Sequence, residues 1–386
     1  MRHEGDAHMS RTRRERYSGP WRNKRTLSPS TSRAKRLEEC KLRHALEERP
    51  RRRICFMSRS RDGRSVQPLS QHFHVRDAVN RIAESRTVTT HDFTLEQVER
   101  VAYACSVELE GMYKLSPFVW REGERFELLL RVVNYSDMAA EKVARIHRGI
   151  SLNGLDFALG DTPVIAPGDD VPGSYDSGGC EDPTVAFVDG RFYVYYSGWN
   201  EHLKRGELLL AQGASLEHLE KRGIALPSTA NASNPKEAEI VRAADGTWRL
   251  FFEYAHDDRS KIGIASAPHV DGPWTVQAPL FAARPGWDEW HLSTGPVIGG
   301  DDILPVMFYN GATRAAQWRI GWVVFDPMFT RVVARCEHPI VLPGERRFPE
   351  DTDIAFAASA VEDGDRIQLY YSIADRHVMR ATILRH

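Results

Sequence analysis

The segment VDGRFYVYYSGW, residues 188–199, contains the pattern on which the fold prediction rests. An acidic residue and a glycine form a turn, an aromatic-rich run follows, and small or polar residues end the run. Glycine and aspartate suit tight turns, whereas Val, Tyr and Phe are favoured in strands. The segment therefore predicts a turn followed by a β-strand.

The same pattern occurs four more times along the chain. The related segments are REGERFELLLRVVNY (121–135), ADGTWRLFFEYAH (244–256), GDDILPVMFYNGA (300–312) and EDGDRIQLYYSIAD (362–375). Each segment is followed by a second β-rich run, so every unit contributes several strands. Units of about 40–60 residues with about four strands are typical of propeller blades.

Five such units predict an all-β fold, a five-bladed β-propeller over residues 116–386. A large β-sandwich also has alternating strands and is the alternative, but the fivefold recurrence of one pattern favours the propeller. Residues 71–115 are predicted as a short, partly helical lead-in. Within them, FTLEQVERVAYAC (93–105) has apolar residues spaced near 3.6 and a threonine able to cap a helix.

Composition divides the chain into a basic start and an acidic body. The 386 residues have a formal net charge of -1, yet residues 1–70 hold 20 Lys and Arg against 8 Asp and Glu. This stretch has few apolar residues, so we predict a disordered basic extension; an arm that touches RNA or a membrane is the alternative. Because the rest of the chain is acidic, binding to nucleic acid is not expected.

Other sequence features restrict location and cofactors. No apolar run of about 18 residues is present, so no membrane span or membrane partner is predicted. The five cysteines are odd in number and lack CxxC spacing, which argues against a zinc ribbon or a disulfide framework and favours a reducing, cytoplasmic setting. No metal site and no cofactor are expected. The partly helical segment before the propeller could cap it or mediate self-association into a homo-oligomer.

Charged residues that precede or interrupt the apolar strands are the candidate site. Glu181 and Asp182 stand directly before Pro183, which favours an extended backbone at Asp182. One carboxylate of such a pair is suited to act as a general acid. Polar residues in comparable places of the other units are Arg131, Lys236, Glu237, Glu253, His291, Asn310, Asp353 and Asp375.

Convergence of these side chains at a propeller axis would create a pocket of carboxylates and cations among Trp and Tyr residues. Such a pocket suits a carbohydrate substrate, because carboxylates bond hydroxyl groups and aromatic faces cover the apolar face of a sugar. A structural hydrogen-bond role is the alternative for each residue taken singly.

From about residue 117 to residue 384, the chain resembles glycoside hydrolase family 130, the five-bladed propellers of β-mannoside phosphorylases and related β-mannosidases. The motifs that carry the resemblance are LLLRVV, GGCEDP, NPKEA, GPV…VMFYNGA, RCEHPIVLP and LYYSIAD. The resemblance implies that Asp182 is the general acid of an inverting reaction. It also implies that Arg131, Lys236 and Asp375 hold the sugar or the nucleophile.

Three positions depart from the family pattern. The family's EDPR ends here in Thr184, its YHG reads Tyr309-Asn310-Gly311, and Glu253 stands where a phosphorylase typically has Arg. Replacing a cation with a carboxylate disfavours phosphate and suits a general base that activates water.

We therefore expect a glycosidase that cleaves a β-linked, mannose-type glycoside with inversion, with Asp182 as acid and Glu253 as base. Glu181, Glu237, His291, Asn310 and Asp353 are expected to bind the substrate together with the residues that the resemblance implies. A phosphate-dependent β-mannoside phosphorylase and a non-catalytic carbohydrate-binding propeller are the alternatives.

Overall fold

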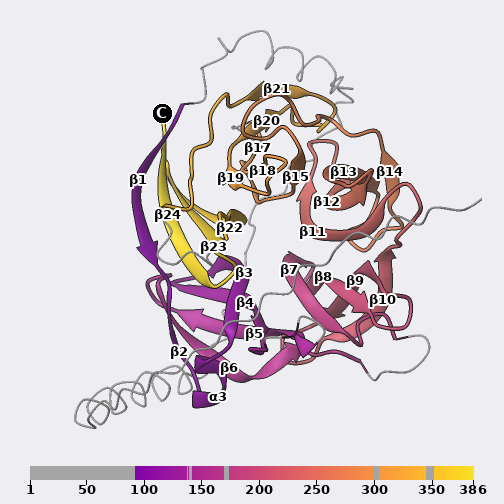
Figure 1. Ribbon diagram of the computed structural model, residues 1–386, viewed down its shortest axis with the longest axis vertical. Helices are drawn as coiled ribbons and strands as arrows, with labels where there is room; N and C mark the ends of the chain where they lie inside the picture. The colour runs from indigo at the N-terminus through magenta and orange to yellow at the C-terminus, as the bar shows by residue number, and fades with distance from the viewer. Residues whose placement is uncertain (1–91, 137, 139–140, 169–173, 300–303, 345–351) are drawn as a thin grey trace, which may run out of the picture. The chain divides into compact units, whose positions relative to one another are not determined.

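The protein is all-β over the part of the chain that the structure describes, as predicted. The computed structural model describes residues 92–386 except 137, 139–140, 169–173, 300–303 and 345–351. The basic extension predicted for 1–70 and the start of the predicted lead-in lie outside these residues. The single helix in the described residues is the one-turn α3 (Val107–Glu110), and 24 strands make up the rest of the secondary structure (Figure 1).

Two sheets from the middle of the chain are antiparallel meanders. Their strand orders are β10-β9-β8-β7 and β11-β12-β13-β14. The first sheet comprises β7 (Gly179–Val188), β8 (Arg191–Asn200), β9 (Arg205–Gly213) and β10 (Glu220–Leu226). The second comprises β11 (Ser233–Arg242), β12 (Trp248–His256), β13 (Arg259–Ala267) and β14 (Thr275–Gln277). Polar residues in their first strands supply much of the candidate site.

Both ends of the described chain contribute to one further sheet, of order β1-β24-β23-β22 (Figure 1). It comprises β1 (Phe93–Arg100), β22 (Ala355–Asp363), β23 (Arg366–Ile373) and β24 (His377–Arg385). The helix predicted over 93–105 is therefore wrong over its whole length, because these residues form β1 and β2 and α3 begins only at Val107. Pairing of β1 with β24 shifts register between Leu95 and Gln97. The irregularity breaks the two-residue alternation, so the apolar spacing resembles that of a helix.

The remaining strands form one large sheet and two small ones. The large sheet has the order β2-β6-β5-β4-β3 and comprises β2 (Ala102–Ala104), β3 (Tyr113–Glu122), β4 (Arg125–Val133), β5 (Ala144–Ser151) and β6 (Asp156–Ile165). The small sheets have the orders β15-β18-β19 and β16-β17-β20-β21. Their strands are β15 (His291–Ser293), β16 (Val297–Ile298), β17 (Val306–Met307), β18 (Asn310–Ala312), β19 (Trp318–Ile320), β20 (Val323–Phe325) and β21 (Val332–Arg335).

Neighbouring sheets contact one another through several strands, including the first strand of most sheets. Strand β3 contacts β22 and β7, β7 contacts β11, β13 contacts β15, and β22 contacts β18 and β19. Buried apolar side chains fill the spaces between sheets, among them the fully buried Leu129, Tyr195, Phe251 and Tyr370. Burial of side chains of this size is the main stabilising contribution to such a fold.

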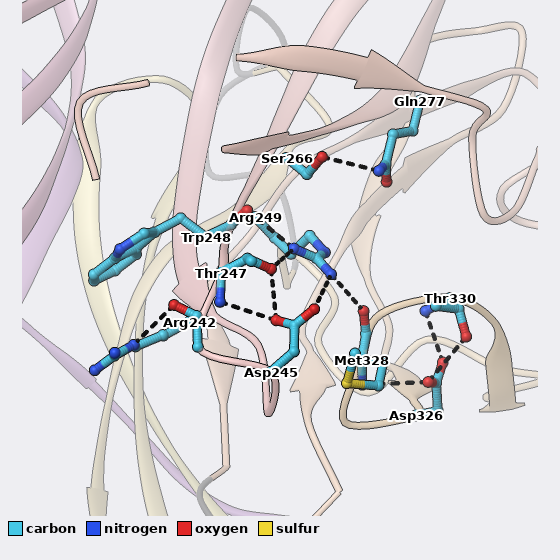
Figure 2. A network of polar contacts seen from close by, with 11 residues as sticks. Arg242, Asp245, Thr247, Trp248, Arg249, Ser266, Gln277, Asp326, Met328 and Thr330 are labelled. Atoms are coloured by element: carbon cyan, nitrogen blue, oxygen red, sulfur yellow. Dashed lines mark hydrogen bonds and ion pairs between the residues drawn. The ribbon is translucent and has the colours of Figure 1, made fainter. Parts of the chain in front are cut away.

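A polar network fixes the hairpin that joins β11 to β12 (Figure 2). The buried Arg249 donates to Thr247 and to the carbonyl oxygen of Met328, and it pairs with Asp245 at 3.6 Å. Asp326 in turn accepts hydrogen bonds from the backbone and hydroxyl of Thr330. Such bonds give the buried guanidinium its partners and hold the far end of the hairpin in place.

Candidate active site

Asp182 is one of two almost fully buried carboxylates of the candidate site, together with Glu253. In β7, Asp182 accepts hydrogen bonds from Ser116 Oγ at 2.7 Å and Arg131 Nη1 at 3.0 Å. Arg131, at the end of the apolar run of β4, also pairs through Nη2 with Glu181 Oε1 at 2.5 Å. One guanidinium thus holds two adjacent carboxylates, a charge-assisted arrangement that fixes the orientation of both.

The backbone at Asp182 differs from the extended conformation that Pro183 led us to expect. Its φ is +49°, and Ser116 and Glu237 have φ values of +48° and +49°. The pairing register is irregular at all three places, in β3, β7 and β11. Bulges of this kind re-aim side chains, and positive φ in non-glycine residues costs about 1–3 kcal/mol each, a cost often met at functional sites.

These side chains line a small cavity. Ser116, Asp182, Glu237, Thr294 and Ala358 all contribute to its wall. The volume of about 10 Å³ accommodates at most one water molecule, so this cavity is too small for a sugar. A substrate must therefore bind outside it.

A second group of charged residues is linked to the first by Lys236. In β11, Lys236 stands opposite Glu253 of β12, and Nζ lies 3.4 Å from Glu253 Oε1. The same oxygen accepts a hydrogen bond from Ser260 Oγ at 2.8 Å, and the Ser260 backbone N–H donates to His291 Nδ1 at 3.0 Å. Because Nδ1 is an acceptor here, a neutral His291 carries its proton on Nε2. Its ring stacks on Trp318 with a centroid distance of 5.6 Å.

The carboxyl groups of this cluster differ in their preferred protonation state. Burial alone would raise the pKa of Asp182, but the charges of Arg131 and Lys236 and the Ser116 bond outweigh it and lower that pKa. The pKa of Glu237 is raised well above its usual range by desolvation and by repulsion from Asp182. Desolvation also raises the pKa of Glu181, although Arg131 opposes the shift. Glu237 therefore retains a proton more readily than Asp182 in the free protein.

Asp375 lies at the edge of this cluster, in the turn between β23 and β24. Its φ is +51°, and partial desolvation raises the pKa of its carboxyl while Arg131 and Lys236 lower it. Both cations are therefore close enough to act on it. The structure brings eight of the expected site residues into one charged group: Arg131, Glu181, Asp182, Lys236, Glu237, Glu253, His291 and Asp375.

Asn310 and Asp353 are placed differently from the expectation. Asn310 is fully buried; its Nδ2 donates to the carbonyl oxygens of Thr294 and Ala357, and its Oδ1 accepts from the Ala357 N–H. Its amide thus joins two backbone segments and is not oriented towards a ligand. Asp353 forms an ion pair with Arg319 at 2.8 Å and accepts a hydrogen bond from Gln317.

Two serines of the site were missed in the sequence. Ser116 donates to Asp182, and Ser260 bonds Glu253 and His291. Ser116 stands before a proline, as Asp182 does, so alignment of the repeated units around Ser116-Pro117 and Asp182-Pro183 would have revealed it. Ser260 has no such signal, because it lies in an ordinary turn-and-strand segment. Thr184, a departure from the family pattern, donates to the Ala238 carbonyl and so links β7 to β11.

Glu239 is a buried carboxyl that should make stability depend on pH. It accepts a hydrogen bond from the Val297 N–H at 3.0 Å, and desolvation raises its pKa to about 8. The folded state therefore keeps this proton above the pH at which the unfolded chain releases it. Stability should fall as pH rises from about 4.5 to about 8, by up to about 1.4 kcal/mol per pH unit.

Glu239→Gln tests this expectation, because glutamine can still accept the Val297 bond but cannot ionise. Chemical unfolding of both proteins between pH 5 and pH 8 should give a larger loss of stability for the wild type. Equal pH dependence of the two proteins would contradict the assignment. Glu124→Gln, at an exposed position in the turn between β3 and β4, is a suitable control for the substitution itself.

No group of three or more His, Cys, Asp or Glu side chains within the described ranges is arranged to hold a metal ion. Among the same residues, no helix is long and apolar enough to cross a membrane.

Comparison with known proteins gives consistent results. A protein-family profile described as beta-1,4-mannooligosaccharide phosphorylase matches residues 116–385. A beta-1,2-mannobiose phosphorylase from a Thermoanaerobacter species is 24% identical over 276 residues, which cover 68% of this chain and 87% of that protein. A beta-1,2-mannobiose phosphorylase from Listeria innocua is 24% identical over 64% of this chain and 67% of that protein.

Solved structures agree with this fold. The beta-1,2-mannobiose complex of the Listeria innocua phosphorylase has a TM-score of 0.59 at 20% identity, covering 74% of this chain and 90% of that chain. A second solved structure has a TM-score of 0.62 at 21% identity, and the match covers 77% of this chain and 95% of that chain. It is described as belonging to a family of mannoside phosphorylases that contains glycoside hydrolases targeting beta-1,2 mannosidic linkages in Candida mannan.

Proposed function

Because the chain belongs to glycoside hydrolase family 130, we propose that it is an enzyme that cleaves a β-mannoside with inversion, with inorganic phosphate as the acceptor. The observation that carries the proposal is the buried Asp182, held by Arg131 and Ser116 beside a second cation, Lys236. The phosphorylase function of the related proteins supports phosphate over water. Our expectation from the sequence alone favoured hydrolysis, and the relatives support the phosphorylase alternative better.

In this proposal, Asp182 is the source of the proton for the departing glycosidic oxygen. Asp182 is ionised in the free protein, since Arg131 and Lys236 lower its pKa, so it must take up a proton when substrate displaces these contacts. Glu237, whose carboxyl retains a proton, lines the same small cavity and is the nearest source. Arg131 and Lys236 then bind the acceptor phosphate, and Asp375 bonds sugar hydroxyls.

Hydrolysis is the second candidate, and the charge of the site favours it. Glu181, Asp182, Glu253 and Asp375 outnumber Arg131 and Lys236, and a phosphate dianion would meet this surplus of carboxylates. Glu253 is the base in that reaction. Its Oε1 faces Lys236 and accepts a hydrogen bond from Ser260 Oγ, so it must act through the other oxygen.

Product analysis separates the two reactions. The full chain is incubated with β-1,2-mannobiose and β-1,4-mannobiose, with and without inorganic phosphate. Phosphorolysis should give mannose 1-phosphate only in the phosphate-containing reaction. Free mannose formed at the same rate in both reactions would establish hydrolysis and overturn the choice of acceptor. Saturable binding of the mannobioses without any product would contradict the enzymatic proposal and favour a carbohydrate-binding role.

We also propose that the sheets form five propeller blades. The two small sheets count as one blade, since β17 and β18 are separated by only two residues. The support is the small cavity, because five separate segments each supply one of its wall residues, namely Ser116, Asp182, Glu237, Thr294 and Ala358. A crystal structure with another sheet arrangement would contradict this count.

A further inference from the structure

Trp290 is held between two arginine side chains. The guanidinium carbon of Arg259 lies 3.8 Å from the ring centroid, and that of Arg314 lies 3.7 Å from it. Two guanidinium groups cannot both lie so close to one centroid on the same face without overlapping. They therefore cover opposite faces, and Trp290 is not available as a stacking platform for a sugar.

Neither arginine has a carboxylate partner among the described residues. By contrast, Arg131 pairs with Glu181, Lys236 with Glu253, and Arg319 with Asp353. Arg259 and Arg314 instead have only the aromatic ring, which leaves their N–H donors available. Guanidinium groups with free N–H donors are suited to bind an anion such as a carboxylate or a phosphate ester.

A cavity of about 370 Å³ opens on one side of this arrangement. Arg259 and Lys261 supply charge to its wall, and Tyr254, Phe281 and Leu292 supply apolar surface. Ser260 belongs to the same wall, and it also bonds Glu253 and His291. The cavity therefore borders the candidate active site, and its size lies in the usual range of small-molecule sites.

We propose that this cavity is a subsite for an acidic sugar of the substrate, with Arg259 as the main contact to its anionic group and Arg314 as support from the far side of Trp290. Aromatic walls suit the C–H face of a sugar ring, and guanidinium groups suit a carboxylate or a phosphate ester. The inference names the substrate class of the proposed function: a β-mannoside whose neighbouring sugar carries an acidic group.

Binding measured without turnover tests the inference. Glucuronic acid, mannose 6-phosphate, glucose, mannose and inorganic phosphate are titrated separately into the full chain by isothermal calorimetry. The two acidic sugars should bind at least about tenfold more tightly than the neutral ones, as expected for a charge-assisted contact. Comparison of the two acidic sugars shows whether the group recognised is a carboxylate or a phosphate ester.

Arg259→Gln should remove most of the preference for acidic sugars, and Arg314→Gln should reduce it. Arg366→Gln is the matched control, because Arg366 of β23 pairs with Glu96 of β1, in a sheet other than that of Arg259. This variant should bind the sugars as the wild type does. Equal affinity for acidic and neutral sugars, or a preference for acidic sugars that Arg259→Gln leaves unchanged, would overturn the inference. Thermal unfolding of each variant shows whether an altered affinity reflects loss of fold.

The preference for acidic sugars can be tested independently of the proposed reaction. A protein that binds acidic sugars but cleaves no mannoside would retain this subsite and lose the proposed function. An active enzyme without the acidic preference would retain the function and lose the subsite.

Discussion

Asp182→Asn should lower kcat/KM for the mannobiose by about a thousandfold while the protein remains folded. Loss of a general acid typically costs 10²–10⁴ in rate. Asparagine has nearly the same shape, and its oxygen can still accept from Ser116 Oγ and Arg131 Nη1, while its NH2 group takes the place of the carboxylate oxygen that faces Ser197 Oγ at 3.4 Å. Arg131 also keeps its pair with Glu181, so no buried cation loses all of its partners. The measurement is steady-state kinetics with phosphate, together with thermal unfolding.

A second substrate separates proton donation from simple positioning. A mannoside with a dinitrophenolate leaving group needs little protonation, so Asp182→Asn should lose far less activity on it than on mannobiose. Equal losses on both substrates would assign Asp182 a positioning role. Asp365→Asn, an exposed carboxylate in the turn before β23, is the control and should be as active as the wild type.

The proximity of Glu237 to Asp182 would reconcile the low pKa of Asp182 with its proposed role as the acid. Two carboxyl groups that share one cavity do not both ionise readily, and here Glu237 retains the proton because Arg131 and Lys236 favour the anion of Asp182. Substrate binding that draws either cation away would raise the pKa of Asp182. Such a site would gain its acid only when a substrate is bound.

Part of the site was predictable because charge within an apolar strand is unusual. Arg131, Asp182 and Glu253 were identified in this way, and the structure places them in one cluster. The same signal failed for Asn310, because an amide that joins two backbone segments also follows a buried strand. Sequence alone cannot separate these cases, since the difference lies in what the side chain faces after folding.

The fold prediction depended on a recurring turn-and-strand pattern, and it failed where that pattern is irregular. The aromatic-rich runs predicted as strands in four of the five units correspond to β4, β8, β12 and β23. In the fourth unit the predicted run is divided into β17 and β18, and before the first unit β1 reads as a helix. An edge strand with one irregularity has too few alternating pairs to be distinguished from an amphipathic helix, and only pairing with β24 determines its conformation.

Phe93→Ala should lower the free energy of unfolding by about 3–4 kcal/mol, the usual cost of removing a buried phenylalanine. Phe93 belongs to β1 and is 8% exposed; its ring lies 5.5 Å from that of Phe308 and 5.4 Å from that of Trp322. The side chain thus joins the first described strand to residues more than 200 positions later. Loss of this contact removes apolar burial and leaves a cavity between two sheets.

Leu95→Ala is the matched control, since Leu95 belongs to the same strand but is 36% exposed, and it should cost less than about 1 kcal/mol. Denaturant unfolding of both variants compares the buried and exposed sides of β1 within the same strand. Equal small effects would show that β1 contributes little to the fold and that the chain could begin later. A large effect of Phe93→Ala together with a small effect of Leu95→Ala would show that the fold depends on residues before the part that matches the family profile, residues 116–385. The reason is that β1 precedes that part and completes the sheet of β22, β23 and β24.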